Sequence, residues 1–345
     1  MTFGSRIRGA RSIARLSLRA LAEQTGVSAQ MISKYERDIS TPDSSMLIKI
    51  STATKMPLDY FFRSNAVELS NPRYRKRKSL PKKDESRIHG QTTDWLERYL
   101  ELEHLSGEGR RFHQPDYGRF PVRTMDDVEQ AADTLRTRWR LGLDPIENLV
   151  DVLEMHGIKV GLLETSPRFD ALTFECSDGR PVIALNKRMS GDRQRFTLAH
   201  ELGHIVLDIQ GDFDEELAGN RFAGAFLVPA EMARAELNGQ RTRLDVYELY
   251  RLKHKYGMSM QAWCYRAKNL GIIQDSQFVH LQKMFAAKDW RKQEPGNQVS
   301  PEHPTQMELL ISRAVSEKRI TRRRAEELFG GPLPTIPGAT GHVTA

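Results

Sequence analysis

The sequence predicts a multi-domain, mainly α-helical protein with one small sheet, in which an all-α bundle precedes a larger α+β domain. Three observations predict this class. Apolar residues recur at helical spacing through the first sixty positions, three short apolar runs between positions 158 and 186 are typical of strands, and a helix with two histidines four residues apart follows them. At 345 residues, the chain is too long for one ordinary core and suggests two or three domains.

The composition excludes several classes of protein. No apolar run approaches the roughly 18 residues that cross a bilayer, and the start lacks the apolar core of a secretory signal, so we expect no membrane contact. Cys176 and Cys264 cannot form a disulfide framework, and we expect them to be buried in a cytoplasmic, nucleoid-associated protein. The net charge of +7 lies largely in the first third of the chain, which indicates a polyanionic partner there.

The first segment, residues 1–67, has the pattern of a DNA-binding bundle. Gly26 ends one helix, and Ser28 is the expected N-cap of the next, which runs to about Arg37 with Ile32 and Tyr35 facing inward. Two helices joined by a short glycine turn form a helix-turn-helix, which lays its second helix in the major groove of double-stranded DNA. Helical spacing before them extends from Ile7 through Leu18.

The segment resembles the Cro/repressor-type, or XRE-type, helix-turn-helix. The resemblance is carried by Leu21-Ala22, Gly26-Val27-Ser28, Ile32-Ser33-Lys34-Tyr35-Glu36-Arg37, Pro42, Leu47 and Leu58-Asp59-Tyr60-Phe61-Phe62. It implies an operator-binding face made of Ala29, Gln30, Ser33 and Lys34, with Arg19 or Glu23 near a backbone phosphate. The alternative is a bundle that contacts only proteins.

A basic junction, residues 68–120, follows the bundle. It holds Arg73, Arg75, Lys76, Arg77, Lys78, Lys82 and Lys83. Such a run is typical of a solvated hinge, and next to a helix-turn-helix it can also neutralise phosphates. A helix from Asp84 to about Leu105 is expected to dock on the following domain or on its copy in a homodimer, and residues 107–119 to form a loop.

The next segment, residues 121–292, contains a motif typical of a metal site. His200 and His204 lie one helical turn apart, so both imidazoles can reach one cation, and Glu201 beside them can handle a proton. Chance would produce this spacing about once in a hundred such chains. Two helices, the second opening at Asp144-Pro145, and the strands 158–162, 171–174 and 181–186 precede it, which is the outline of a zincin.

A third ligand is expected on the following helix, within residues 214–229. Glu216 shares a helix face with Gly219, Asn220 and Ala223, whose small side chains would let this helix approach the histidine helix closely. Glu215 is the second choice, and acids in a first helical turn can also serve only the helix dipole.

This segment resembles the ImmA/IrrE-type metallopeptidases. The resemblance is carried by Arg193-Gln194-Arg195-Phe196-Thr197-Leu198-Ala199-His200-Glu201-Leu202-Gly203-His204, Glu216, Phe222-Ala223 and Phe226-Leu227-Val228-Pro229. It implies one Zn²⁺ per chain on His200, His204 and Glu216, with Glu201 as the catalytic base. The family usually has alanine at the position of Gly219 and methionine at that of Val228, and neither departure changes a ligand.

The remaining candidates concern substrate. The strand 182–186 is expected to pair with an extended peptide, and Tyr265, Arg266 and Asn186 are candidates for oxyanion or substrate contacts, with a structural role as the alternative for Tyr265 and Arg266. In the tail, residues 293–345, helices around 309–315 and from the N-cap Thr321 to Phe329 are expected to form a docking element, and residues from 330 onward to be disordered.

We therefore predict a transcriptional regulator with a zinc-dependent endopeptidase domain that cleaves a repressor protein, or its own basic hinge, to switch gene expression. A second hypothesis is a transcription factor whose zinc pocket senses a ligand without turnover. The presence of Glu201 favours catalysis over ligand sensing, because a sensor has no need of a residue that transfers a proton. A third is a component of a toxin–antitoxin or prophage module, which the neighbouring genes would reveal.

Overall fold

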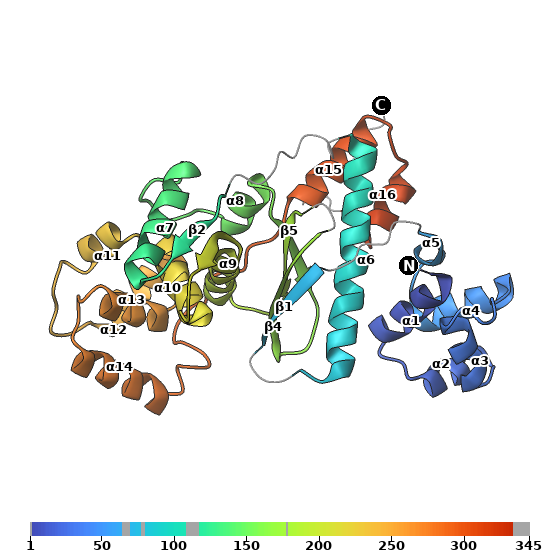
Figure 1. Ribbon diagram of the computed structural model, residues 1–345, viewed down its shortest axis with the longest axis horizontal. Helices are drawn as coiled ribbons and strands as arrows, with labels where there is room; N and C mark the ends of the chain where they lie inside the picture. Colours follow the sequence, from blue (N-terminus) through green and yellow to red (C-terminus); the bar gives the residue numbers. More distant parts are fainter. Residues whose placement is uncertain (1, 64–69, 77–79, 108–116, 177–178, 334–345) are drawn as a thin grey trace.

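One long helix stands between the N-terminal bundle and the rest of the protein (Figure 1). The computed structural model describes residues 2–63, 70–76, 80–107, 117–176 and 179–333. The long helix is α6, Lys82–Ser106, which packs against α1 of the bundle and against β3, α15 and α16. The molecule is mainly helical, as predicted, and the described residues form two small sheets where the sequence predicted one.

The bundle contains α1 (Phe3–Ile13), α2 (Leu18–Thr25), α3 (Ala29–Glu36), α4 (Ser44–Thr54) and α5 (Leu58–Phe62). Gly26 ends α2 in the left-handed conformation, and the Ser28 hydroxyl caps α3 by accepting the N–H of Met31, as the sequence predicts. The prediction of helical structure through Leu18 is wrong, because Arg15 takes a φ of 60° and Ser17 caps α2 as a new helix.

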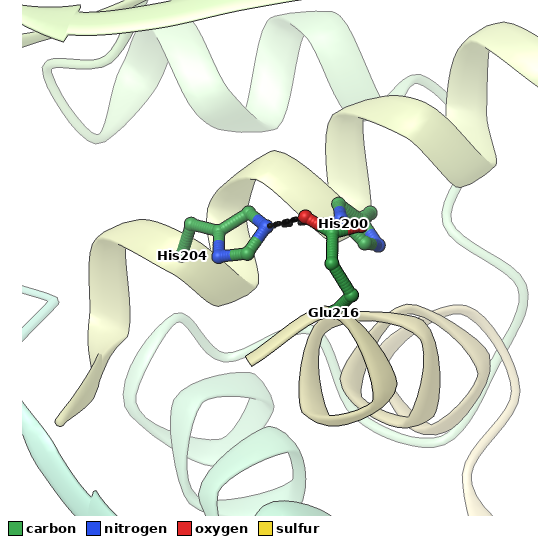
Figure 2. Close-up of side chains that lie close together, drawn as sticks. All are labelled: His200, His204 and Glu216. Carbon is green, nitrogen blue, oxygen red and sulfur yellow. Dashed lines mark hydrogen bonds and ion pairs between the residues drawn. The ribbon is translucent and has the colours of Figure 1, made fainter. Parts of the chain in front are cut away.

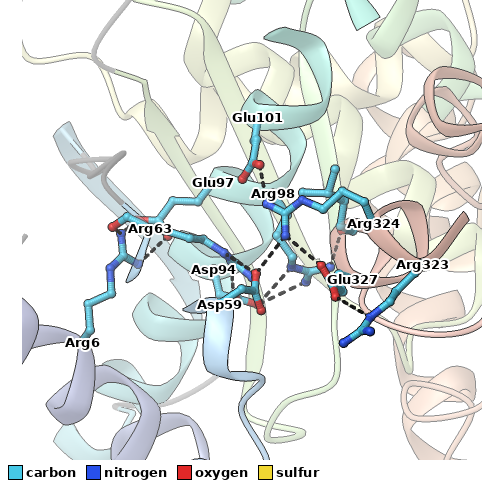
Figure 3. Close-up of polar contacts among 11 residues, drawn as sticks. Arg6, Asp59, Arg63, Asp94, Glu97, Arg98, Glu101, Arg323, Arg324 and Glu327 are labelled. Carbon is cyan, nitrogen blue, oxygen red and sulfur yellow. Dashed lines mark hydrogen bonds and ion pairs between the residues drawn. The ribbon is translucent and has the colours of Figure 1, made fainter. Parts of the chain in front are cut away.

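Buried and half-buried ion pairs hold the bundle to α6. Arg6 of α1 pairs with Glu97 of α6 at 2.6 Å, and both side chains are at most 2% exposed. Arg63, just after α5, pairs with Asp94 of α6 at 2.8 Å (Figure 3). The same network reaches the tail, where Arg324 of α16 pairs with Asp59, Glu101 and Glu327.

The tail helices α15 (Gln306–Ser316) and α16 (Arg322–Phe329) dock on α6. Their apolar residues share a core with Tyr99 and Leu102 of α6. Residues 334–345, which fall in the part predicted to be disordered, lie outside the described residues, as do residues 108–116 of the predicted loop.

The main sheet has four strands in the order β1-β4-β5-β3. The three predicted strands are β3 (Lys159–Leu163), β4 (Phe169–Glu175) and β5 (Pro181–Asn186), with β5 parallel to β3 and antiparallel to β4. The fourth, β1 (Ser70–Lys76), was not predicted and lies in the basic junction expected to be a hinge. It pairs antiparallel with β4.

This topology corrects one expectation about substrate. The strand 182–186 cannot accept an extended peptide, because β5 already has β4 on one side and β3 on the other. All six of its residues are buried, as befits an interior strand.

The metallopeptidase-like body is completed by helices and a second, two-stranded sheet. In this sheet β2 (Phe120–Val122) runs parallel to β6 (Leu207–Ile209). The helices are α7 (Met125–Arg138), α8 (Leu149–Met155), α9 (Gly191–Val206), α10 (Glu215–Leu227), α11 (Ala230–Glu236), α12 (Val246–Tyr256), α13 (Met260–Asn269) and α14 (Asp275–Ala287). The expected helix start at Asp144 is wrong, because Asn148 caps α8 through the N–H of Asp151.

Within the part of the chain that the structure describes, no helix has both the length and the apolar character needed to cross a membrane.

Candidate metal centre

Two helices cross closely at the predicted histidine motif. A Cβ placed on Gly203 of α9 would lie 3.4 Å from the Cα of Gly219 in α10, so the backbones meet where both side chains are absent. This close approach agrees with the small face predicted for α10. It brings the first turn of α10 across the histidine-bearing face of α9 (Figure 2).

His200, His204 and Glu216 form the triangle expected from the sequence. The two Nε2 atoms are 3.0 Å apart, and the Glu216 carboxylate oxygens lie 3.5 Å from Nε2 of His200 and 3.4 Å from Nε2 of His204 (Figure 2). All three donor atoms lie within 4.8 Å of one another. Ligands about 2.1 Å from one zinc at tetrahedral angles would be about 3.4 Å apart, so these residues fit a single zinc-sized cation.

The triangle is closed on the α9 side and open on the α10 side. The His200 side chain is fully buried and that of His204 is 11% exposed, whereas that of Glu216 is 70% exposed. Glu215 is an exposed residue of the same first turn, and Glu216 is the acid that the structure groups with the histidines. The centre is therefore accessible to solvent on the side of Glu216.

Asn220 orients one of the predicted ligands. Its Oδ1 lies 3.0 Å from Nδ1 of His200, and the tautomer with a proton on Nδ1 donates this hydrogen bond. That assignment leaves the lone pair of Nε2 directed at the triangle. The sequence prediction used Asn220 only as a small residue, although its i+4 spacing from Glu216 places it on the same face.

Gly219 makes room for the His200 ring. A Cβ at this position would lie 2.9 Å from Cε1 of His200 and 3.1 Å from its Nδ1. Gly219, the position at which related proteins usually have alanine, therefore contacts the ring of the predicted ligand His200.

Glu201 lies beside the triangle and is held by the sheet. Its side chain is buried, and its Oε2 accepts a hydrogen bond from Oγ1 of Thr173 at 2.7 Å. Thr173 belongs to β4. A second contact between β4 and α9 is the ion pair of Asp170 with Arg193 at 2.6 Å. Sequence reasoning missed Thr173, since only the pairing of strands reveals its neighbours.

The structure places the three substrate candidates in other contacts. The Asn186 amide donates to the carbonyls of Ser166 and Phe169, and its carbonyl accepts from the N–H of Arg188. These bonds correct the expectation for Asn186, because they commit its polar atoms to a loop.

Arg266 and Tyr265 have structural contacts. The Arg266 guanidinium is buried and bonds to the Glu129 carboxylate and the Val228 carbonyl. Tyr265 packs edge-on against Phe278 of α14. Both positions agree with the structural alternative.

The predicted DNA-reading residues gather on the second helix of the helix-turn-helix. Gln30 is exposed in α3, and Ala29, Ser33 and Lys34 are half-buried in the same helix. Arg19 is exposed in the first turn of α2.

The fold and this site define a DNA-binding helix-turn-helix protein with a metallopeptidase-like domain, and comparison with known families agrees. Residues 10–61 match the family model described as "Helix-turn-helix", and residues 154–268 match that described as "IrrE N-terminal-like domain". The chain thus joins an XRE-type helix-turn-helix to an IrrE/ImmA-like metallopeptidase domain, as predicted.

Two curated relatives resemble separate parts of the chain. An "Uncharacterized transcriptional regulator in ATPase CF(0) region" of Rhodospirillum rubrum is 39% identical over 21% of this chain and 64% of its own length. The "Radiation response metalloprotease IrrE" of Deinococcus deserti is 38% identical over 15% of this chain and 24% of its own length. The chain therefore spans less than two thirds of either relative.

One solved structure, ComR from Streptococcus suis, aligns with 95% of this chain and 88% of its own at 13% identity. The TM-score of 0.17 is too low to support an argument about fold.

Proposed function

We propose that this protein is a DNA-binding transcriptional regulator with a zinc-dependent endopeptidase centre, which cleaves a repressor protein or its own chain to switch gene expression. The grouping of His200, His204 and Glu216 within 4.8 Å, beside the buried Glu201, carries the proposal. The match of residues 154–268 to the IrrE-like family supports it independently.

The residues have complementary tasks in peptide hydrolysis. His200, His204 and Glu216 would hold the zinc ion, which supplies Lewis acidity toward water and the peptide carbonyl. Glu201 takes a proton from the attacking water and delivers it to the leaving amine, so that one C–N bond is exchanged for one C–O bond. Thr173 keeps the Glu201 carboxylate in place.

The substrate enters over the open side of the centre. The exposed Glu216 and the closed α9 side support a substrate that arrives as a protein segment from solution or from elsewhere in the chain. The helix-turn-helix would bring the peptidase to an operator.

Incubation of zinc-loaded protein with candidate repressors, and with itself, tests the proposal when products are read by mass spectrometry. We expect defined cleavage that the Glu201→Gln variant loses by at least a hundredfold while it keeps one zinc per chain. Cleavage at an unchanged rate in that variant would remove the base assignment. Zinc and operator binding without any cleavage would favour the ligand-sensing alternative.

DNA binding is tested separately through salt. The affinity for operator DNA should fall steeply with salt concentration, and Arg19→Ala should reduce the log–log slope by about one. A slope near zero for the intact protein would contradict the regulator role.

A further inference from the structure

The strand β4 connects the main sheet to the helix of the candidate catalytic centre. Thr173 of β4 bonds to Glu201, and Asp170 of β4 pairs with Arg193 of α9. On one side β4 pairs with β5 through five consecutive residues, 171 to 175. Its other side pairs with β1, and without β1 it would present N–H and C=O groups that an extended peptide can bind.

Residues 70–76 of the chain itself occupy this side of β4 as β1. The register pairs Arg73 with Thr173, the residue that holds Glu201, and Tyr74 and Arg75 with the two residues before it. The backbone of the segment therefore runs antiparallel to β4 alongside the centre, as an extended peptide bound by strand addition would.

The pairing of β1 is less regular than that inside the sheet. Only 73, 74 and 75 pair in an unbroken register, and register shifts fall on both sides of them. Pro72, which has no backbone N–H, lies within the first shift. Fewer continuous ladder bonds mean that β1 can leave β4 at lower cost than β5 can.

We propose that residues 70–76 occupy in cis the side of β4 on which the peptidase would bind a peptide substrate, so that this segment is an internal competitor of the substrate. This inference rests on the proposed function. The ligand class is an extended Arg- and Lys-rich peptide, since five of residues 70–78 are basic. Another peptide binds only when β1 leaves, so the intact chain is self-blocked.

Binding of a labelled synthetic peptide with the sequence of residues 68–78 tests this in the full-length chain, measured by fluorescence anisotropy. The Glu201→Gln background prevents cleavage of the probe. A variant with residues 70–76 replaced by glycine and serine should bind the peptide at least tenfold more tightly than the chain with β1 intact. Equal affinity in the two chains would overturn the proposal.

Two backbone-methylated peptides are the matched controls. One is N-methylated at residues 73 and 75, and the other at residue 74. In an antiparallel ladder these sets face opposite sides, so one peptide should lose binding and the other keep it. Their side chains and charge are identical. Equal binding of both would indicate charge attraction alone and overturn the proposal.

A milder variant covers the case in which the seven-residue replacement fails to fold. Arg73→Pro with Tyr74→Pro alters only two residues and removes one N–H group from each side of β1, so that its pairing with β4 loses a donor. Circular dichroism verifies that this variant is folded. If the folded variant gains no affinity for the peptide, the proposal is also overturned.

The outcomes separate this inference from the proposed function. Zinc-loaded protein that retains Glu201 could bind the peptide along β4 once β1 is removed and yet cleave nothing. That result would contradict the peptidase function and support the peptide-binding site. Cleavage of a repressor at the same rate with and without β1 would support the peptidase function and contradict the proposed blocking of the site by β1.

Discussion

Thr173 in β4 donates its hydroxyl hydrogen to Oε2 of Glu201 in α9 across 2.7 Å, and both side chains are buried. A residue of the sheet thus fixes the rotamer of the carboxylate that would move the proton. The bond joins the strand that can hold a peptide to the helix that can hold a metal.

The Thr173→Val variant should lose rate without losing metal. Valine keeps the shape of the side chain but removes the hydroxyl, so Glu201 is no longer held in one orientation. We expect kcat for a peptide to fall about ten- to a hundredfold, with KM and zinc content nearly unchanged. Thr173→Ser should restore most of kcat, and failure of serine to do so would assign the loss to packing.

The identity of the third ligand is tested by a pair of neighbouring substitutions. Glu216→Gln should lower zinc content well below one equivalent per chain after dialysis, because the neutral amide is a poor ligand. Glu215→Gln removes the same charge from the same helical turn and should retain the full equivalent. Zinc loss in the Glu215 variant alone would reverse the assignment.

The close contact of Gly219 with His200 predicts opposite effects of alanine at two sites in α10. Gly219→Ala should destabilise the fold by about 1–3 kcal/mol and weaken zinc binding, because the new methyl group would overlap the His200 ring. Gly224→Ala adds a methyl group at an ordinary contact distance of 3.6 Å from Cδ of Arg266 and should gain up to about 1 kcal/mol of helix propensity. Urea unfolding measures both changes in stability. Equal effects would contradict the close contact between Gly219 and the His200 ring.

Glu154 predicts a pH dependence of stability. Burial raises its pKa to about 7, although the backbone N–H groups of Thr305 and Gln306 bond to its carboxylate and partly offset this. Between the usual pKa of 4.5 and about 7, the folded state binds more protons at this site than the unfolded state does. The contribution of Glu154 to stability therefore falls as pH rises through this window and stays low above it.

Glu154→Gln should remove this loss. We expect the variant to gain up to about 3 kcal/mol over the parent at pH 8 and little at pH 4, by urea unfolding. The exposed Glu147→Gln is the control for the loss of one negative charge. Parallel pH profiles for the parent and the Glu154 variant would contradict the prediction.

The local parts of the site could be predicted because they depend on helical periodicity. His200 and His204 are one turn apart on any helix, and Glu216 shares its face with small residues that allow a close crossing. The caps at Ser28 and Thr321 follow from local chemistry in the same way.

The parts that depend on long-range pairing could not be predicted. β1 lies in a run of basic residues with a proline, which is typical of a hinge, and only its pairing with β4 makes it a strand. The partner of Glu201 follows from the same arrangement, because Thr173 reaches α9 through the sheet. Asn186 was a substrate candidate, but its amide donates to the carbonyls of Ser166 and Phe169, a pairing that the sequence does not show.

The strand β1 also lies on the only covalent path from α5 to α6. A single hydrolysed bond within it would leave the DNA-binding bundle attached through side-chain pairs such as Arg6 with Glu97. The bundle and the body now associate within one chain, at a high effective concentration. After cleavage they would associate as two molecules, and dilution or salt could dissociate them. The bundle's hold on the body would then depend on protein concentration rather than on chain connectivity.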